Sequence, residues 1–212
     1  MNRSERKGGL KMGYDKTAWL KRMRLRSDMS AYVTHLTREN LPLRPIDVLL
    51  KILKEQKLNA STNGGFISGS EGAVCFQDAP LHSITQNLIH EQFNMEELGN
   101  KVRYRLFGLC FRKDYAFRKG ARPVIYEQRE IAKQKFKDEL WRVVTFDLTD
   151  ADRIIDWTHE REWRAKGDFA FELSEATILI TNSSAYNTFM KKVDKDILEK
   201  IGGIVVLDPI LT

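Results

Sequence analysis

The chain has 212 residues, of which 42% are hydrophobic and 30% charged, with a net charge of +6. This composition is ordinary for a folded globular protein, and the length fits one large domain. Because no run of 18 apolar residues occurs, no segment is predicted to cross a membrane.

The cysteines and the N-terminus indicate the compartment. Cys75 and Cys110 are too few for a disulfide framework, and both have apolar neighbours in the sequence. The N-terminus opens with charged residues and lacks the apolar stretch of a signal peptide. We therefore expect two buried, reduced thiols and a cytoplasmic protein.

Positive charge is concentrated near the N-terminus. Residues 1–28 carry nine basic and three acidic residues, so the rest of the chain is neutral. Such an arm attracts nucleic acid or another acidic partner, although a solvated helix without a partner has the same composition. We expect a basic arm over residues 1–30 and a single α+β domain over residues 31–212.

The first half of the chain is predicted to alternate helices and strands from its apolar spacing and its prolines. In order, the expected elements are a short helix around Trp19–Leu25, a strand at Tyr32–Leu36, a helix from Pro45 through Lys57, a strand at Ala73–Phe76 and a helix at Leu81–Leu98.

The second half is predicted to be richer in strands. The expected strands are Tyr104–Phe111, Pro123–Tyr126, Arg142–Phe146, Glu162–Arg164, Ala176–Ile180 and Gly203–Leu207. The expected helices are Lys113–Gly120, Glu127–Leu140 and Tyr186–Lys200. Together these elements predict an α+β fold with a mixed, mostly antiparallel sheet flanked by helices.

Residues 159–164 are the sharpest local feature. If the segment is extended, Glu160, Glu162 and Arg164 project to one face. One such carboxylate could hold a ribose hydroxyl and stabilise an oxocarbenium-like transition state. The alternative is an edge strand of charges that pair across a sheet. No metal is expected, because the four histidines lack partners at ligand spacing.

Two other segments are candidates for a site. His35 shares a strand face with Val33 and Thr37, where a histidine is either a satisfied core residue or part of a site. The run Arg103–Lys113 interleaves basic and aromatic residues, which suits anion binding or base stacking. It equally suits a strand with an apolar inner face and a basic outer face.

Four blocks of the chain resemble the AbiGi family. They are Val74–Leu81, Tyr104–Lys113, Gly120–Tyr126 and Glu160–Arg164, the last being similar to that family's Glu-Arg-Glu-Trp-Arg motif. The likeness covers roughly residues 31–181 and leaves the basic arm outside it. AbiGi proteins are abortive-infection phage-resistance proteins, some of them the antitoxin of a pair. The resemblance implies phage defence, with a cognate toxin or antitoxin as partner.

A wider similarity is to the DarT-like ADP-ribosyltransferases. Tyr32–Leu36, Asn40–Leu41 and Ile52–Leu53 resemble the opening strand of those enzymes, which bears a His or Arg that holds NAD, and the helix that follows. The resemblance implies an ADP-ribosyltransferase-like fold. The chain lacks the Asn-x-Arg segment of the DarT type, so the acceptor stays open between nucleic acid and protein.

The same similarity implies the roles of individual residues. Glu162 matches the catalytic glutamate and Glu160 the first residue of an E-x-E pair, while His35 matches the contact to the ribose of NAD. The residues then expected to bind NAD are His35, Tyr104, Arg105, Tyr126 and Arg164.

Two functions from different classes follow. The first is an ADP-ribosyltransferase that transfers ADP-ribose from NAD to a nucleic acid or protein. The second is a non-catalytic antitoxin or sensor that binds a partner protein or nucleic acid. Convergence of His35, Glu160 and Glu162 around one open pocket would favour the enzyme. A buried, salt-bridged Glu162 without a pocket would favour the binder.

Overall fold

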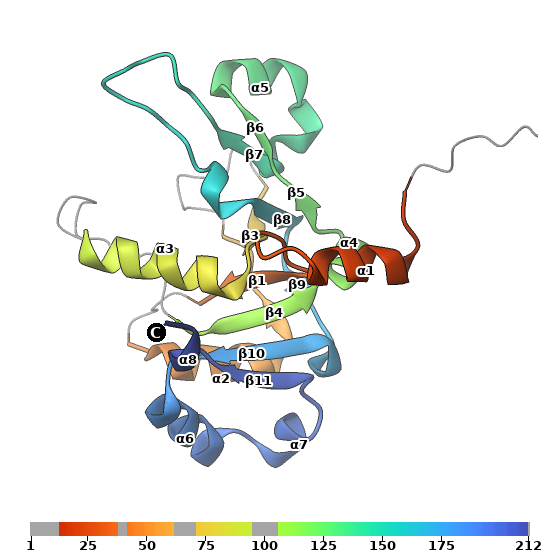
Figure 1. Ribbon diagram of the computed structural model, residues 1–212, viewed down its shortest axis with the longest axis vertical. Helices are drawn as coiled ribbons and strands as arrows, with labels where there is room; N and C mark the ends of the chain where they lie inside the picture. Colours follow the sequence, from red (N-terminus) through yellow and green to blue (C-terminus); the bar gives the residue numbers. More distant parts are fainter. Residues whose placement is uncertain (1–12, 38–41, 62–70, 95–105, 212) are drawn as a thin grey trace, which may run out of the picture.

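A seven-stranded sheet forms the centre of the protein, whose computed structural model describes residues 13–37, 42–61, 71–94 and 106–211. Its strand order is β11-β10-β4-β1-β3-β8-β5 (Figure 1). Neighbouring strands are antiparallel except for β10 and β11, which are parallel. The predicted α+β class with a mixed, mostly antiparallel sheet and flanking helices is confirmed.

Short strands build this sheet and two smaller ones. The central strands are β1 (Tyr32–Leu36), β3 (Ala73–Gln77), β4 (Gly108–Arg112), β5 (Arg122–Pro123), β8 (Glu162–Lys166), β10 (Ala176–Ile180) and β11 (Gly203–Val206). The two-stranded sheets join β2 (Lys57–Leu58) to β9 (Phe169–Ala170) and β6 (Ile125–Glu127) to β7 (Val143–Thr145).

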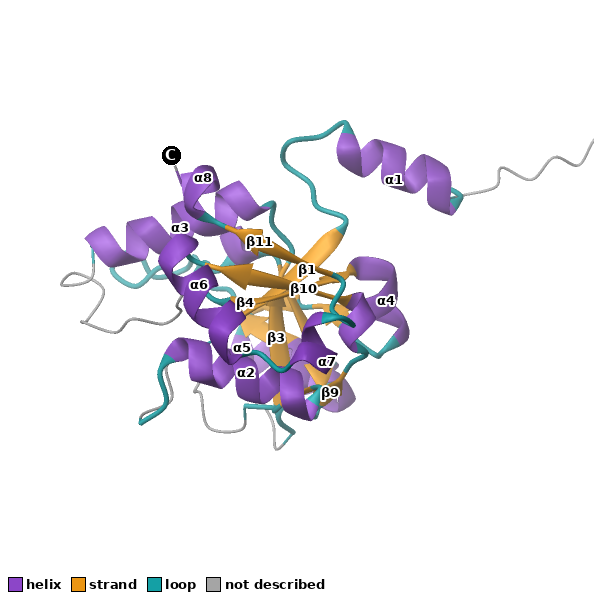
Figure 2. Ribbon diagram, turned by 90° about the horizontal axis from the view of Figure 1, so that it is seen from below, coloured by secondary structure: helices purple, strands orange, loops and turns teal. Residues whose placement is uncertain are grey.

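Helices cover both faces of the central sheet (Figure 2). They are α1 (Lys16–Arg24), α2 (Pro45–Glu55), α3 (Leu81–Phe93), α4 (Lys113–Arg118), α5 (Arg129–Lys135), α6 (Ser183–Lys192), α7 (Lys195–Leu198) and α8 (Asp208–Leu211). Short 3₁₀ helices η1 (Lys137–Arg142), η2 (Thr158–Glu160) and η3 (Leu173–Glu175) complete the fold. None of the helices in the described ranges is long and apolar enough to span a membrane.

Local sequence signals set several helix boundaries. Asp15 begins α1, since its carboxylate accepts a hydrogen bond from the Ala18 amide at 2.8 Å. Pro45 opens α2, where its fixed φ suits the first turn, and Gln56 ends that helix in the left-handed region at φ 49°. Asn182 caps α6 through the amide of Ala185.

Two helices predicted as continuous are broken. The expected helix over 127–140 is α5 followed by η1, because the chain leaves helical geometry at Phe136. The bend brings Trp141 of η1 into the interior, where it is 7% exposed. The expected helix over 186–200 is α6 followed by α7. Val193 is extended between them, so that Phe189 and Ile197 both reach the core.

Each face of the sheet has its own core. On one face, side chains such as Val74, Phe76 and Phe111 pack against α2, α4, α6 and α7. An aromatic cluster lies at its centre, with Phe169 at 5.0 Å from Phe76 and 5.3 Å from Phe111 between ring centroids. On the other face, smaller side chains of β1, β4 and β10 pack against α3 and α8.

The sheet is weakly paired at its centre. β1 and β4 are paired at five positions and β3 and β8 at five, whereas β1 and β3 are paired at a single position, Thr34 with Gln77. Beyond that position the two strands separate. The sheet is thus partly divided into a β11-β10-β4-β1 half and a β3-β8-β5 half.

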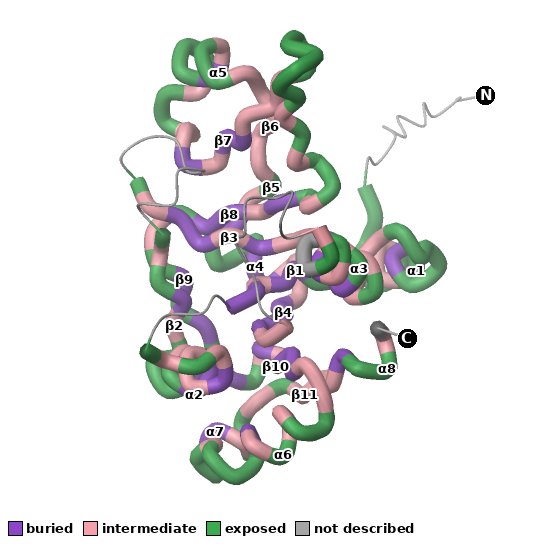
Figure 3. Tube along the Cα trace, turned by 90° about the vertical axis from the view of Figure 1, so that its left-hand side faces the viewer, coloured by how far each residue is buried: buried purple, intermediate pink, exposed green. Residues whose placement is uncertain are grey.

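Residues 124–157 form a separate unit above the edge of the sheet, which we call the β6–β7 lobe. It contains β6, α5, η1 and β7 and returns to the sheet through η2 (Figures 1 and 3). The parallel pairing of β6 with β7 is independent of the central sheet. The lobe meets the sheet at the start of β8, where Val124 donates a hydrogen bond to the Glu162 carbonyl at 3.0 Å.

We predict that Gly108→Ala destabilises the protein. A Cβ at Gly108 would overlap the carbonyl oxygen of His35 and approach the Cα of Leu36 to 3.1 Å, and both atoms belong to the β1 backbone. Because backbone cannot move aside as a side chain can, we expect a loss of about 3 kcal/mol, measured by chemical denaturation. An unchanged unfolding midpoint would contradict the close approach of β4 to β1.

Candidate functional site

A cavity of about 380 Å³ lies where β1 and β3 separate. It is lined by residues of β1, β3 and α2 and by both glutamates that precede and begin β8. Apolar side chains such as Val48, Ile52 and Val74 form part of the wall. The volume lies within the usual range of small-molecule sites, which are mostly apolar with a few convergent polar groups.

The predicted residues His35, Glu160 and Glu162 converge on this cavity. His35 comes from β1, Glu160 from the end of η2 and Glu162 from the first position of β8. Gln77 of β3 lies between the two strands that carry them, since it pairs with both Thr34 and Glu162. Two segments that are distant in the sequence therefore contribute side chains to the lining of one cavity.

Glu162 forms a buried ion pair with Arg164. The Nε of Arg164 lies 2.8 Å from one carboxylate oxygen and its Nη2 lies 3.1 Å from the other. The side chains are 9% and 1% exposed. Such a bidentate pair fixes the plane of the carboxylate as well as its charge. A carboxylate has about four acceptor positions, so this pair leaves Glu162 able to accept further hydrogen bonds.

Arg164 lies behind the cavity wall. Its Nη1 donates to the carbonyl oxygens of Trp141 at 3.1 Å and Val143 at 3.0 Å. Burial lowers the pKa of Arg164, but the hydrogen bonds and charge of Glu162 outweigh this and raise it. The cavity lining does not include Arg164. Its guanidinium is thus engaged by protein groups, and it holds the Glu162 carboxylate from outside the cavity lining.

The corner between Glu160 and Glu162 is irregular, contrary to the expectation of an extended segment. Glu160 ends a 3₁₀ helix, and Arg161 adopts left-handed geometry with φ 46°. Both glutamates reach the cavity because of the turn at Arg161, and not because of the alternation of side chains along a strand that was predicted. The Arg161 carbonyl accepts a hydrogen bond from the Asp78 amide at 3.2 Å.

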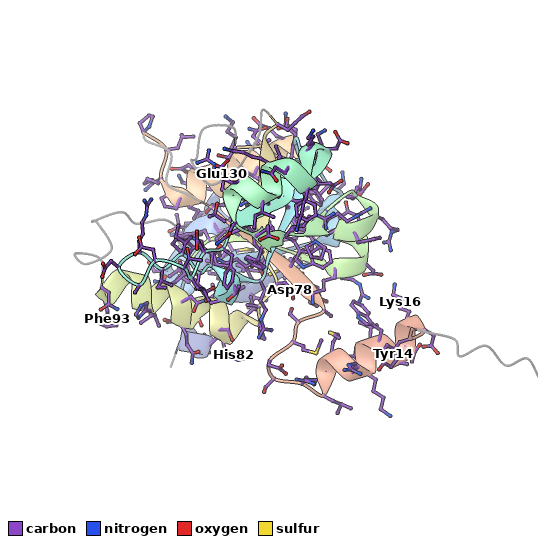
Figure 4. All side chains as sticks on the ribbon, turned by 90° about the horizontal axis from the view of Figure 1, so that it is seen from above. Tyr14, Lys16, Asp78, His82, Phe93 and Glu130 are labelled. Atoms are coloured by element: carbon purple, nitrogen blue, oxygen red, sulfur yellow. The ribbon has the colours of Figure 1, made fainter. Side chains whose placement is uncertain are left out.

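Asp78 anchors this corner to the rest of the sheet (Figure 4). Its carboxylate forms an ion pair with Lys113 at 2.6 Å and accepts a hydrogen bond from the Trp163 indole at 3.1 Å. Burial raises the pKa of Asp78, although both partners oppose the shift. The indole N–H of Trp163 therefore has a hydrogen-bond partner within the protein. Because side chains alternate along a strand, Trp163 lies on the face of β8 opposite to Glu162.

His35 bridges the separated strands. Its Nδ1 lies 2.8 Å from the carbonyl oxygen of Cys75 on β3, and its ring meets Phe76 edge-on at 6.0 Å. A carbonyl can only accept, so Nδ1 carries the hydrogen of this bond. In the neutral ring, Nε2 is then an acceptor.

Tyr126 reaches the site from the lobe. Its hydroxyl accepts a hydrogen bond from the Glu162 amide at 3.2 Å and donates to the Trp157 carbonyl at 3.5 Å. Burial raises the pKa of Tyr126, and the hydrogen bond from Glu162 partly opposes this. Tyr126 thus contacts the backbone of Glu162 and is not part of the cavity lining. Tyr104 and Arg105, the other residues expected to bind NAD, lie outside the described residues.

Cys75 and the residues from α2 were not predicted to belong to the site. The expectation of two buried thiols is wrong for Cys75, which is half-buried and lines the cavity, and correct for Cys110. Neither cysteine forms a disulfide bond. Lys51 and Glu55 add charges from α2, where they form an ion pair at 3.8 Å. The amphipathic pattern of α2 predicted the helix but gave no sign that its outer edge borders a cavity.

Comparison of the chain with protein-family models, with curated proteins and with solved structures finds no match. Within the described ranges, no group of three or more His, Cys, Asp or Glu side chains is arranged to hold a metal ion.

We predict that the two thiols differ in reactivity. In the folded protein, a thiol-specific reagent should modify Cys75 in the cavity wall and leave Cys110 untouched. Burial raises the pKa of the Cys110 thiol to about 12, against a weaker opposing hydrogen bond to Thr34. Mass spectrometry should count one adduct in the native protein and two in denaturant, and none in native Cys75→Ser. Native labelling of Cys110 would contradict the assignment.

Proposed function

We propose that the protein is an NAD-dependent ADP-ribosyltransferase of phage defence, acting in the cytoplasm. The observation that carries the proposal is the convergence of His35, Glu160 and Glu162 on one cavity of ligand size. The resemblance to the AbiGi family supports the defence role, and the resemblance to DarT-like enzymes supports the ADP-ribosyltransferase-like fold and the chemistry. Two cysteines that form no disulfide bond suit a reducing compartment.

The proposed reaction breaks the bond between nicotinamide and C1 of the ribose. The bonding electrons go to the ring nitrogen, which neutralises the pyridinium, and positive charge builds on the ribose. The Glu162 carboxylate accepts a hydrogen bond from a ribose hydroxyl and stabilises that charge. The acceptor then forms a bond to C1, and Glu160, which is less buried, takes the proton of the acceptor.

His35 has a positioning part in this scheme. Its Nδ1–H bond to the Cys75 carbonyl holds the ring across the gap between β1 and β3. The ring also lines the cavity, where it can contact the ribose of a bound NAD. The acidic wall formed by Glu160 and Glu162 favours the cationic nicotinamide ring over a neutral one.

The ion pair of Glu162 favours the second function, a non-catalytic antitoxin or sensor. Glu162 is buried and salt-bridged, as expected for a structural carboxylate. The other half of that expectation, the lack of a pocket, does not hold because Glu162 lines the cavity. We therefore rank the enzyme first and the binder of a partner protein or nucleic acid second.

We predict that Glu162→Gln abolishes nicotinamide release from NAD, followed by NMR with protein, DNA and RNA fractions of a bacterial lysate added separately. Removal of one preorganised charge-stabilising group lowers the rate by about 10²–10³-fold. Glu172→Gln is the matched control, since Glu172 is an exposed carboxylate bonded to Tyr115 and Lys119 and does not line the cavity.

The fraction that supports release names the class of acceptor. A folded Glu162→Gln protein that releases nicotinamide at the wild-type rate would contradict the proposed role of Glu162. No release by the wild type in any fraction would favour the partner-binding function, and a pull-down of the partner would follow.

The basic arm is proposed to attract nucleic acid, either as acceptor or as partner. Helix α1 projects from the body (Figure 4). Lys16 on this helix forms an ion pair with Asp114 at 2.8 Å, and Met23 is buried. Lys21 and Arg24 on this helix are exposed and form no ion pair with the part of the chain that the structure describes. They are therefore available to bind phosphate groups.

We predict that Lys21→Gln with Arg24→Gln weakens binding to DNA or RNA. Removal of one phosphate-binding charge lowers the slope of log affinity against log salt by about one, so the double variant should lower it by about two. The control is Lys191→Gln with Lys200→Gln, which removes the same exposed charge near α6 and α7. Equal slopes for the α1 variant and the wild type would show that the arm does not bind phosphate groups and is only a solvated surface.

A further inference from the structure

The carboxylate of Glu162 is joined to the β6–β7 lobe by one buried side chain. Arg164 donates to both oxygens of that carboxylate on one side. On the other side it donates to the carbonyls of Trp141 and Val143, which belong to the lobe. The guanidinium therefore spans two parts of the fold that share no strand ladder.

A second link connects the same two parts. Tyr126, on β6 of the lobe, accepts the amide hydrogen of Glu162 through its hydroxyl. The side chain and the backbone of Glu162 are thus held by different groups, one of them in the lobe and the other anchored to it. Both bonds involve groups that are buried or half-buried, where solvent cannot replace a missing partner without cost.

We propose that Arg164 is a positioning residue, through which the position of the β6–β7 lobe sets the orientation of the Glu162 carboxylate. The inference rests on the proposed function, because it concerns the group that acts on the ribose. Arg164 does not line the cavity, so it acts through Glu162 and does not touch the substrate.

The chemistry of arginine makes this link specific. A guanidinium is planar and rigid and offers five donors, and at least four of them bond oxygen atoms of Glu162, Trp141 and Val143. Lysine keeps the charge but has three donors on one atom and cannot span both sides. With lysine at this position, the Glu162 carboxylate would still have a positive partner, but the plane of the carboxylate would no longer be fixed.

A shift of the lobe would reach the site by the same route. If η1 and β7 move, the Trp141 and Val143 carbonyls leave a guanidinium that is 1% exposed and cannot turn to water. The side chain must then follow the lobe or rearrange, and the carboxylate bound to it moves as well. A misplacement of about 1 Å in a reacting group can lower a rate by about 10²-fold.

The first test is Arg164→Lys, assayed by nicotinamide release. We expect kcat to fall by about 10²-fold with KM for NAD unchanged, because the cavity lining stays intact. A variant that loses kcat and raises KM together, with a lowered unfolding temperature, would show a merely structural arginine and overturn the proposal.

The second test approaches Glu162 from the lobe and stays informative if Arg164→Lys fails to fold. Tyr126→Phe removes only the hydroxyl that accepts from the Glu162 amide, and we expect kcat to fall by about tenfold. Tyr115→Phe is the matched control, because its hydroxyl bonds Glu172, outside the cavity lining. Equal effects of the two variants would overturn the proposal.

The third test needs no turnover. By native-state hydrogen exchange without ligand, Arg164→Lys, or Tyr126→Phe in its place, should speed exchange over both 141–145 and 162–166, with β10 unchanged. Faster exchange over 162–166 alone would overturn the link to the lobe. If the wild type releases no nicotinamide, the proposed function fails, and this exchange pattern alone decides whether the lobe holds Glu162.

Discussion

The separation of β1 from β3 is the constraint on which the cavity depends. Antiparallel strands that pair at one position leave later amides and carbonyls without ladder partners, and buried groups of this kind need other partners. The His35 side chain supplies one of them, by donating to the Cys75 carbonyl across the gap. The histidine therefore closes the sheet where the backbone does not, and the cavity begins beside it.

The burial of the Glu162–Arg164 ion pair is a second constraint on the site. A buried ion pair contributes little net stability compared with well-packed apolar side chains, since desolvation offsets the attraction. Breaking one is costly, however, because it leaves a buried charge without a partner. A protein that needed only stability at this point could use an apolar pair. Two buried charges beside a cavity are better explained by a need for a carboxylate of fixed orientation.

The sequence predicted those parts of the fold that depend on local pattern. Apolar spacing indicated β1, α2 and β10, and Pro45 lies at the start of α2 as expected. The sequence-based prediction was wrong where packing between residues far apart in the sequence determines where a helix ends. The break at Val193 lets Phe189 and Ile197 share one core, and no local signal distinguishes it from a continuous helix.

The candidate site was predictable to a similar degree. His35, Glu160 and Glu162 were singled out by residue type and resemblance, and they meet at one cavity. Their convergence depends on the left-handed turn at Arg161, which strand alternation does not suggest. The support role of Arg164 was missed, because it requires carbonyls of a lobe far away in sequence.

The form of the cavity bears on the choice between enzyme and binder. A protein partner is usually recognised by an exposed surface with aromatic anchors, whereas this site is concave and has carboxylates in its wall. Glu160 at the end of η2 and Glu162 at the start of β8 face it, and the Lys51–Glu55 ion pair borders it from α2. Such a lining, with three glutamates and one lysine, suits a small ligand that carries a cationic group. A macromolecular partner would more naturally use α1, which projects from the body. A small ligand in the cavity and a macromolecule on α1 can therefore be bound at the same time.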